Sequence, residues 1–163
     1  MNNSRPSGSR GAAEFLAVVA RLLLGTAFLY LGLNKALHPV EFLKLLRQYD
    51  LTENPLALNL LASALPWFEV FCGALLLAGV AVRGTALVTI GMLVPFTVLI
   101  FRRALALKSA LSIAFCAVKF DCGCGNGAEF ICRKLAENLL LIAVAAWLLS
   151  GYGRRFSLRY ALW

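Results

Sequence analysis

Four long apolar stretches dominate the pattern of the chain, and short polar segments separate them. They cover residues 15–37, 57–82, 84–103 and 133–151. A helix of about 20 apolar residues, rising about 1.5 Å per residue, crosses the hydrocarbon core of a bilayer. Lipid offers no partner to an unpaired backbone group, so such stretches are expected to form helices that pack together. The pattern therefore predicts an all-α fold, an integral membrane four-helix bundle that occupies residues 14–153.

Shorter segments between these stretches are expected to form helices at the membrane surface. The step from His38 to Pro39 should end the first helix, because a residue before proline avoids the helical region. Residues 104–118 are apolar but include Lys108, and they are too short to cross again. We interpret them as an interfacial continuation of the third helix. Residues 40–51 have the i, i+3, i+4, i+7 spacing of an amphipathic interfacial helix, in Phe42, Leu45, Leu46 and Tyr49.

The ends of the bundle are predicted from composition and from local signals. Residues 1–13 are rich in Ser, Gly, Asn and Arg, cannot bury a core, and are expected to be a disordered tail. Residues 154–163 carry three arginines and are interpreted as a basic anchoring tail. Asn126 followed by Glu129 resembles a helix-start signal, which would place the beginning of the last helix near Gly127.

Composition and charge agree with a chain that is solvated partly by lipid. Apolar residues make up 61% of the sequence, against about 45–50% in soluble proteins. The net charge of +8 raises the question of nucleic-acid binding. However, the basic residues fall mostly at the ends of the apolar stretches, where lysine and arginine flank membrane helices. No zinc-finger, RNA-binding or basic-zipper pattern is present, so the expected partner is the bilayer and not nucleic acid.

Four of the five cysteines gather just before the last apolar stretch. Cys122 and Cys124 stand one residue apart in a glycine-rich loop, and we predict that they exchange disulfides with the thiols of a partner. Cys132, or Cys116, is then expected to pass the electrons on. Arg133 and Lys134 follow Cys132 directly, and nearby cations favour the reactive thiolate form. Cys72 lies inside an apolar stretch and is predicted to be a buried hydrophobic residue.

Two other interpretations of the cysteines remain open. A structural disulfide could simply hold the loop in place. Three or four of the cysteines could also bind zinc, but a Cys-x-Cys pair without a second Cys-x-x-Cys or a histidine pair fits structural zinc spacing poorly. No metal site is therefore predicted.

Ionisable residues inside the apolar stretches form a second candidate site. Such residues are costly in lipid and usually pair or line a cavity. Arg21 and Glu69 each lie well inside their helices and are expected to meet, either as a structural ion pair or as the polar lining for a quinone head group. Lys35, near the end of the first stretch, is interpreted as an interfacial anchor that contributes to the same site. A small transporter whose substrate path runs past Arg21 and Glu69 is a further alternative.

Several short motifs follow one another along the chain: Gly32-x-x-Lys35 followed by His38-Pro39, Pro66-Trp67-x-Glu69 with Gly73, and Cys122-Gly123-Cys124-Gly125. In this order they resemble the MauE branch of the DoxX-like membrane proteins. The resemblance covers roughly residues 15–149 and implies a four-helix protein of the bacterial inner membrane. MauE is linked to maturation of methylamine dehydrogenase, whose small subunit is rich in disulfides, and DoxX relatives are associated with thiosulfate:quinone oxidoreduction.

The resemblance implies thiol–disulfide chemistry in the periplasm, whereas the charge pattern alone favours the opposite orientation. More basic residues fall on the side of the cysteine loop than on the side of the termini, and the positive-inside rule would place that loop in the cytoplasm. We follow the resemblance and expect a periplasmic loop. The expected function is a thiol–disulfide oxidoreductase that helps to form disulfides in a periplasmic client or exchanges with a thioredoxin-like protein, with a membrane quinone as an optional acceptor. The alternatives are a non-enzymatic maturation factor and a small transporter.

Overall fold

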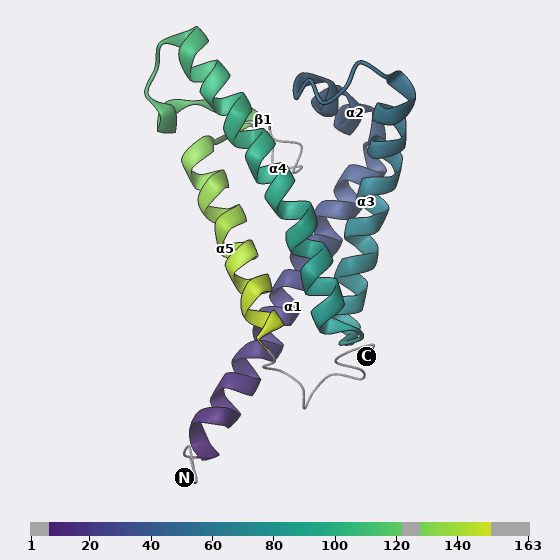
Figure 1. The fold of residues 1–163 in the computed structure, drawn as a ribbon, viewed down its shortest axis with the longest axis vertical. Helices are drawn as coiled ribbons and strands as arrows, with labels where there is room; N and C mark the ends of the chain where they lie inside the picture. Colours follow the sequence, from purple (N-terminus) through teal and green to yellow (C-terminus); the bar gives the residue numbers. More distant parts are fainter. Residues whose placement is uncertain (1–6, 122–127, 151–163) are drawn as a thin grey trace.

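The computed structural model describes residues 7–121 and 128–150, with side chains from residue 11 onward. Within these residues the fold is helical apart from one small hairpin, which confirms the predicted all-α class. Figure 1 shows the arrangement. The elements are α1 (Ser7–Leu37), α2 (Pro39–Gln48), α3 (Pro55–Ala78), α4 (Val82–Leu111), the short 3-10 helix η1 (Phe115–Ala117), β1 (Lys119–Asp121), β2 (Ala128–Phe130) and α5 (Ile131–Leu149).

Three helices in the described part of the chain are long and apolar enough to cross a membrane. They are the segments Gly11–Leu37 of α1, Pro55–Ala78 of α3 and Val82–Leu111 of α4. Large apolar side chains point outward from each of them, as lipid-facing residues do; Leu23, for example, is 67% exposed. The chain is therefore a multi-pass membrane protein. Helix α5 has only 19 residues and three charges in its first two turns, so a fourth crossing remains a prediction.

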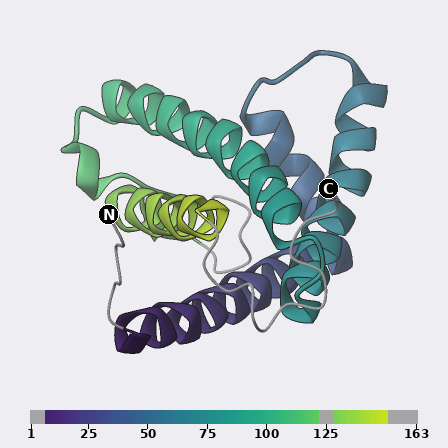
Figure 2. The ribbon, with the colours of Figure 1, turned by 60° about the horizontal axis from the view of Figure 1, so that its bottom comes forward.

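The helices form two antiparallel pairs, α1 with α3 and α4 with α5. The pairs diverge towards the end of the molecule that carries α2 and the hairpin (Figure 1). Contacts between α3 and α4 and between α1 and α5 join them. Figure 2 shows α5 lying between α4 and α1. This arrangement leaves α5 with helices on two sides and places its first turns close to the hairpin.

Glycines set the close approach of α1 and α3. A Cβ atom on Gly73 would lie 2.6 Å from the backbone nitrogen of Leu29, and one on Gly32 would lie 2.8 Å from the carbonyl oxygen of Pro66. Both distances are too short for any side chain. Small residues allow backbones in lipid to approach until dispersion contacts hold them together. The register between α1 and α3 is therefore fixed at two glycine positions.

Helix α2 is amphipathic, as its spacing predicts. Phe42 and Leu46 are buried and pack against Leu58 and Ala62 of α3, whereas Lys44 on the opposite face is exposed. Helix α1 ends at Leu37, as expected from the proline two residues later. The next helix, α3, begins with a side-chain cap in which Asn54 accepts hydrogen bonds from the first backbone N–H groups.

Three predicted boundaries differ from the structure. Helix α1 begins at Ser7 and so includes residues 7–13, which were expected to be disordered, because adding residues to an existing helix costs little. Helix α5 begins at Ile131 and not near Gly127, because residues 128–130 pair with residues 119–121 as strands. Helix α4 continues unbroken to Leu111 and ends at Ser112, which has a φ of 51°. The predicted continuation over residues 104–118 therefore stops at Leu111, and residues 112–118 leave the helix. The tail at residues 154–163 lies outside the described residues.

Candidate functional site

The structure joins Cys116 and Cys132, the two cysteines predicted to pass electrons on, in a disulfide bond. Their Cα atoms are 5.1 Å apart, a normal separation for a disulfide. Cys116 lies in η1 and is exposed, and Cys132 lies half-buried in the first turn of α5. The bond therefore ties the segment that leaves α4 to the beginning of α5, and one of its sulfur-bearing residues faces outward.

A small apolar cluster supports this disulfide. Val118 and Ile131 are buried together with Ile100 and Ala104 of α4. The N–H of Ile131 donates a 3.1 Å hydrogen bond to the carbonyl oxygen of Val118, which docks the beginning of α5 onto the chain just after η1. The cluster holds the backbone on both sides of the disulfide, so the position of the bond does not depend on the disulfide alone.

The hairpin brings the two ends of the Cys-x-Cys loop to one place. Asp121 in β1 pairs directly with Ala128 in β2, and Cys122 follows Asp121 in the sequence. Cys122 and Cys124 themselves lie outside the described residues. Strand β2 runs directly into α5, so only Ile131 separates the hairpin from Cys132. The loop that carries the predicted reactive pair is therefore anchored beside the Cys116–Cys132 disulfide.

The second candidate site is an ion pair between Lys35 and Glu69. The Lys35 Nζ atom lies 2.6 Å from one carboxylate oxygen of Glu69 and 2.8 Å from the other. The two side chains are only 4% and 13% exposed. The ammonium group also lies 5.4 Å from the ring centre of Phe42 and 5.2 Å from that of Phe96. Lys35 is therefore a buried partner of Glu69 and not an interfacial anchor, which corrects its predicted role.

Arg21 does not form the expected pair with Glu69. Gly32 lies against Pro66 and Glu69, whereas Gly25 lies against Gly73 and Leu77. Because α1 and α3 are antiparallel, Arg21 lies beyond Gly25 and near the far end of α3. Eleven residues separate Gly32 from Arg21, or about 16 Å along a helix axis. Arg21 is buried at 7% exposure, but the helix register separates it from the carboxylate.

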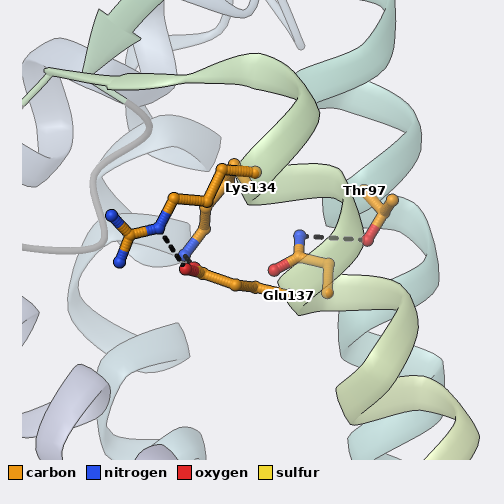
Figure 3. A network of polar contacts seen from close by, with 5 residues as sticks. Thr97, Lys134 and Glu137 are labelled. Carbon is orange, nitrogen blue, oxygen red and sulfur yellow. Dashed lines mark hydrogen bonds and ion pairs between the residues drawn. The ribbon is translucent and has the colours of Figure 1, made fainter.

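Helix α5 contributes two buried polar residues that the sequence analysis missed. Lys134 is 6% exposed and Asn138 is 3% exposed. The Asn138 amide donates a 3.1 Å hydrogen bond to the hydroxyl oxygen of Thr97 in α4. The Glu137 carboxylate forms two ion pairs, with Oε1 2.9 Å from Arg133 Nε and Oε2 3.5 Å from Lys134 Nζ (Figure 3). Lys134 and Asn138 have the i, i+4 spacing of residues on one helix face, and Ala145 is buried on the same face. This spacing is the signal that could have predicted that both polar residues are buried.

Lys35, Glu69, Lys134 and Asn138 line one small cavity between the helices. The cavity has a volume of about 20 Å³ and receives side chains from α1, α3, α4 and α5. That space suits about one water molecule, whereas ligand sites typically have roughly 300–1,000 Å³. A quinone head group does not fit beside Lys35 and Glu69 in this arrangement of the helices, so the predicted quinone site at Arg21, Glu69 and Lys35 gains no support.

Cys72 shows the environment that the sequence predicts for it. It is a free cysteine in α3, with 4% of its surface exposed, and it packs with Leu24 and Leu76 in the main apolar cluster. This cluster includes residues from the beginning of α4 and the end of α5. The other two cysteines in the described residues form the Cys116–Cys132 disulfide, which lies beyond the end of α4 and at the beginning of α5. Cys72 therefore acts in packing and not in the sulfur chemistry.

Together, these features define a class of protein: a multi-pass membrane protein with a disulfide and a small hairpin at one end of its helices. Residues 13–151 match the family model of the methylamine utilisation protein MauE. The match covers most of the chain, which therefore belongs to the MauE family, as the motifs predicted. No curated protein and no solved structure matched the chain.

Proposed function

We propose that this chain is a thiol–disulfide exchange protein of the bacterial inner membrane, with its cysteine loop in the periplasm. It carries electrons from the thiols of a periplasmic client to the disulfide of a thioredoxin-like partner. The observation that carries the proposal is the Cys116–Cys132 disulfide close to the hairpin whose strands end at Asp121 and begin at Ala128, on either side of the Cys-x-Cys segment in the sequence. The family description supports a client that takes part in methylamine utilisation.

The proposed cycle is a chain of exchanges between dithiols and disulfides. A client thiolate attacks a Cys122–Cys124 disulfide and forms a mixed disulfide with one of these cysteines. The second client thiolate then attacks the client sulfur of this mixed disulfide, and the loop cysteine leaves as a thiolate. The client gains a disulfide, and Cys122 and Cys124 take up its two electrons and two protons. These thiols next reduce the Cys116–Cys132 disulfide, which the partner's disulfide restores. The sum is one disulfide formed in the client and one reduced in the partner, so no other oxidant is needed.

The exposure of Cys116 supports the last step. A thiolate must reach one sulfur of a disulfide along the axis of the bond, so exposed disulfides are the ones that exchange. Cys116 is exposed, while Cys132 is half-buried on α5. In that step the exposed Cys116 thiolate would therefore attack the partner's disulfide, and the Cys132 thiolate would then attack Cys116 in the mixed disulfide and release the reduced partner. The periplasm is an oxidising compartment in which such a pair persists.

Thiol trapping in intact cells tests the cycle. Cells are treated with a membrane-impermeant alkylating reagent, and the state of each cysteine is read by mass spectrometry. In Cys122→Ser/Cys124→Ser, the Cys116–Cys132 pair should stay oxidised, because client electrons no longer reach it. In Cys116→Ser/Cys132→Ser, the Cys122–Cys124 pair should accumulate as thiols. Cys72→Ser is the matched control and should change neither pair.

A second candidate function is a maturation factor whose disulfide only braces the docking loop. The specific observation in its favour is the buried cluster under the disulfide, which resembles a structural support. This candidate predicts that both cysteine pairs stay fully oxidised in every variant that retains them, and that result would refute the exchange cycle. The transporter alternative has weaker support, because the Lys35–Glu69 pair closes the space between the helices.

A further inference from the structure

A second, larger cavity lies between the C-terminal end of α2 and the C-terminal half of α4. Its volume is about 280 Å³, close to the lower end of the range for small-molecule sites. We call it the arginine groove. The residues that line it are Gln48, Tyr49, Asp50, Leu51, Leu99, Arg102, Arg103 and Ala106.

The arginine groove carries excess positive charge. Arg102 and Arg103 line it together with one acidic residue, Asp50. The salt bridges found among the described residues involve Lys35, Arg133 and Lys134, and neither groove arginine takes part in them. Two guanidinium groups against one carboxylate leave a net charge of about +1. Guanidinium groups present paired N–H donors that match the oxygens of a phosphate group.

The groove also lies where α4 leaves the apolar part of the membrane. The α4 residues before Arg102 include a single charge, Arg83, near the beginning of the helix. On the other side of the groove, α2 is the amphipathic helix expected to lie in the interface. Because Arg102 and Arg103 follow this apolar part of α4, in the half of the helix that leads to the hairpin, we expect them at the depth of the lipid head groups.

An apolar strip leads from the groove towards the middle of the bilayer. Val94, Val98 and Arg102 follow one another at i, i+4 and i+8, so they share one face of α4. Val94 is 42% exposed and Val98 is 51% exposed. A ligand whose phosphate lies at Arg102 can therefore place a hydrocarbon chain along this face. Free phosphate would use the arginines but would leave the strip without a role.

We infer that the arginine groove binds the phosphate group of an anionic phospholipid. Arg102 and Arg103 hold the phosphodiester, and an acyl chain lies along Val98 and Val94. Asp50 limits the charge of the groove to about one positive unit, which suits a singly charged phosphodiester better than a phosphomonoester. This site is separate from the sulfur chemistry and does not depend on the proposed exchange cycle.

Native mass spectrometry of the full-length protein in detergent tests the inference. The protein is titrated with phosphatidylglycerol, phosphatidylcholine, inorganic phosphate or a quinone, and bound adducts are counted. Phosphatidylglycerol should bind best. Arg102→Gln/Arg103→Gln should weaken its binding at least about tenfold, because charge-assisted hydrogen bonds are lost. The control Lys44→Gln/Arg47→Gln removes the same charge from α2 outside the groove and should bind within about twofold of the unmodified chain.

A second variant keeps the test decisive if the arginine variant fails to fold. Asp50 has a φ of 48°, a conformation that asparagine tolerates well. Asp50→Asn should therefore fold and should bind phosphatidylglycerol several-fold more tightly, because it removes the only acid in the groove. The inference is overturned if Asp50→Asn leaves binding unchanged, or if both arginine and control variants lose binding equally. Preferential binding of inorganic phosphate, phosphatidylcholine or the quinone would overturn it as well.

Discussion

Glu69 and Lys35 form the most enclosed ion pair in the described part of the chain. Both carboxylate oxygens accept from one ammonium group, and the ring centres of Phe42 and Phe96 lie 5.4 Å and 5.2 Å from that group. Replacing a buried pair with apolar residues is often neutral, whereas removing one partner leaves a charge without compensation. Each of the two charged side chains can therefore stay buried at low cost only while the other is present.

Glu69→Gln should destabilise the protein by about 3 kcal/mol, because Lys35 would stay buried without a counter-charge. The free energy of unfolding in detergent, followed by circular dichroism, measures the effect. Glu41→Gln is the control, since Glu41 is exposed on α2, and it should change stability by less than about 0.5 kcal/mol.

The double variant Lys35→Met/Glu69→Gln should recover part of the stability that Glu69→Gln loses, because no unpaired charge remains. Lys35→Met alone completes the comparison. If the losses in the free energy of unfolding of Lys35→Met and Glu69→Gln add up to the loss in the double variant, the two side chains are not coupled, and the effect expected from their burial is contradicted.

At the scale of the helices, the contact between α1 and α3 rests on residues that have no side chain. Gly32 faces the backbone of Pro66 and Val70, and Gly73 faces Leu29. Side chains would push the helices apart, and the register that aligns Lys35 with Glu69 would be lost with them. The ion pair is thus a consequence of helix packing and not its cause.

Gly32→Ala should lower stability by about 1–3 kcal/mol, because its Cβ would lie within 2.8 Å of two backbone atoms. Gly91→Ala offers a matched control in α4, where a Cβ would meet nothing within 4 Å. The control should be neutral or slightly stabilising, since alanine favours a helix more than glycine does. Thermal unfolding of both variants in the same detergent compares them, and equal melting temperatures would contradict the packing argument.

At the scale of the whole molecule, the position of the charges along α5 predicts that this helix also crosses the bilayer. Its charged residues lie in the first two turns, and its remaining residues, from Leu139 to Leu149, are apolar. Lys134 and Asn138 are buried against other helices and so do not face lipid. The charges that make α5 unlike the other long helices therefore lie at the end beside the hairpin, which agrees with a fourth crossing.

Single cysteines at the two ends of the helix pair α4–α5 test this crossing. In a chain whose five cysteines are replaced by serine, Ser112→Cys should react with an impermeant maleimide in spheroplasts. Ser150→Cys should react only after the membrane is opened. The reverse result would place the hairpin in the cytoplasm. Labelling of both positions from one side would show that α5 does not cross.

The sequence predicted the long helices and α2 because their periodic patterns extend over many residues. It singled out Cys116 and Cys132 as alternative relays but did not predict that they form a disulfide with each other. It did not predict the hairpin, because strands of three residues are too short to show an alternating pattern. The partner of Glu69 was predicted wrongly, because that choice depends on the register between two helices. Lys134 and Asn138 were missed because charged neighbours hide their shared face.

The glycine contact between α1 and α3 also has a consequence for the order of assembly. Every residue of that contact lies before residue 79, and the first of the paired cysteines, Cys116, follows much later. Chains are synthesised from the N-terminus, and early parts fold first. The first half of the molecule can therefore dock while the ribosome is still making the second, so Cys116 and Cys132 are synthesised after α1 and α3 have already packed together in the membrane.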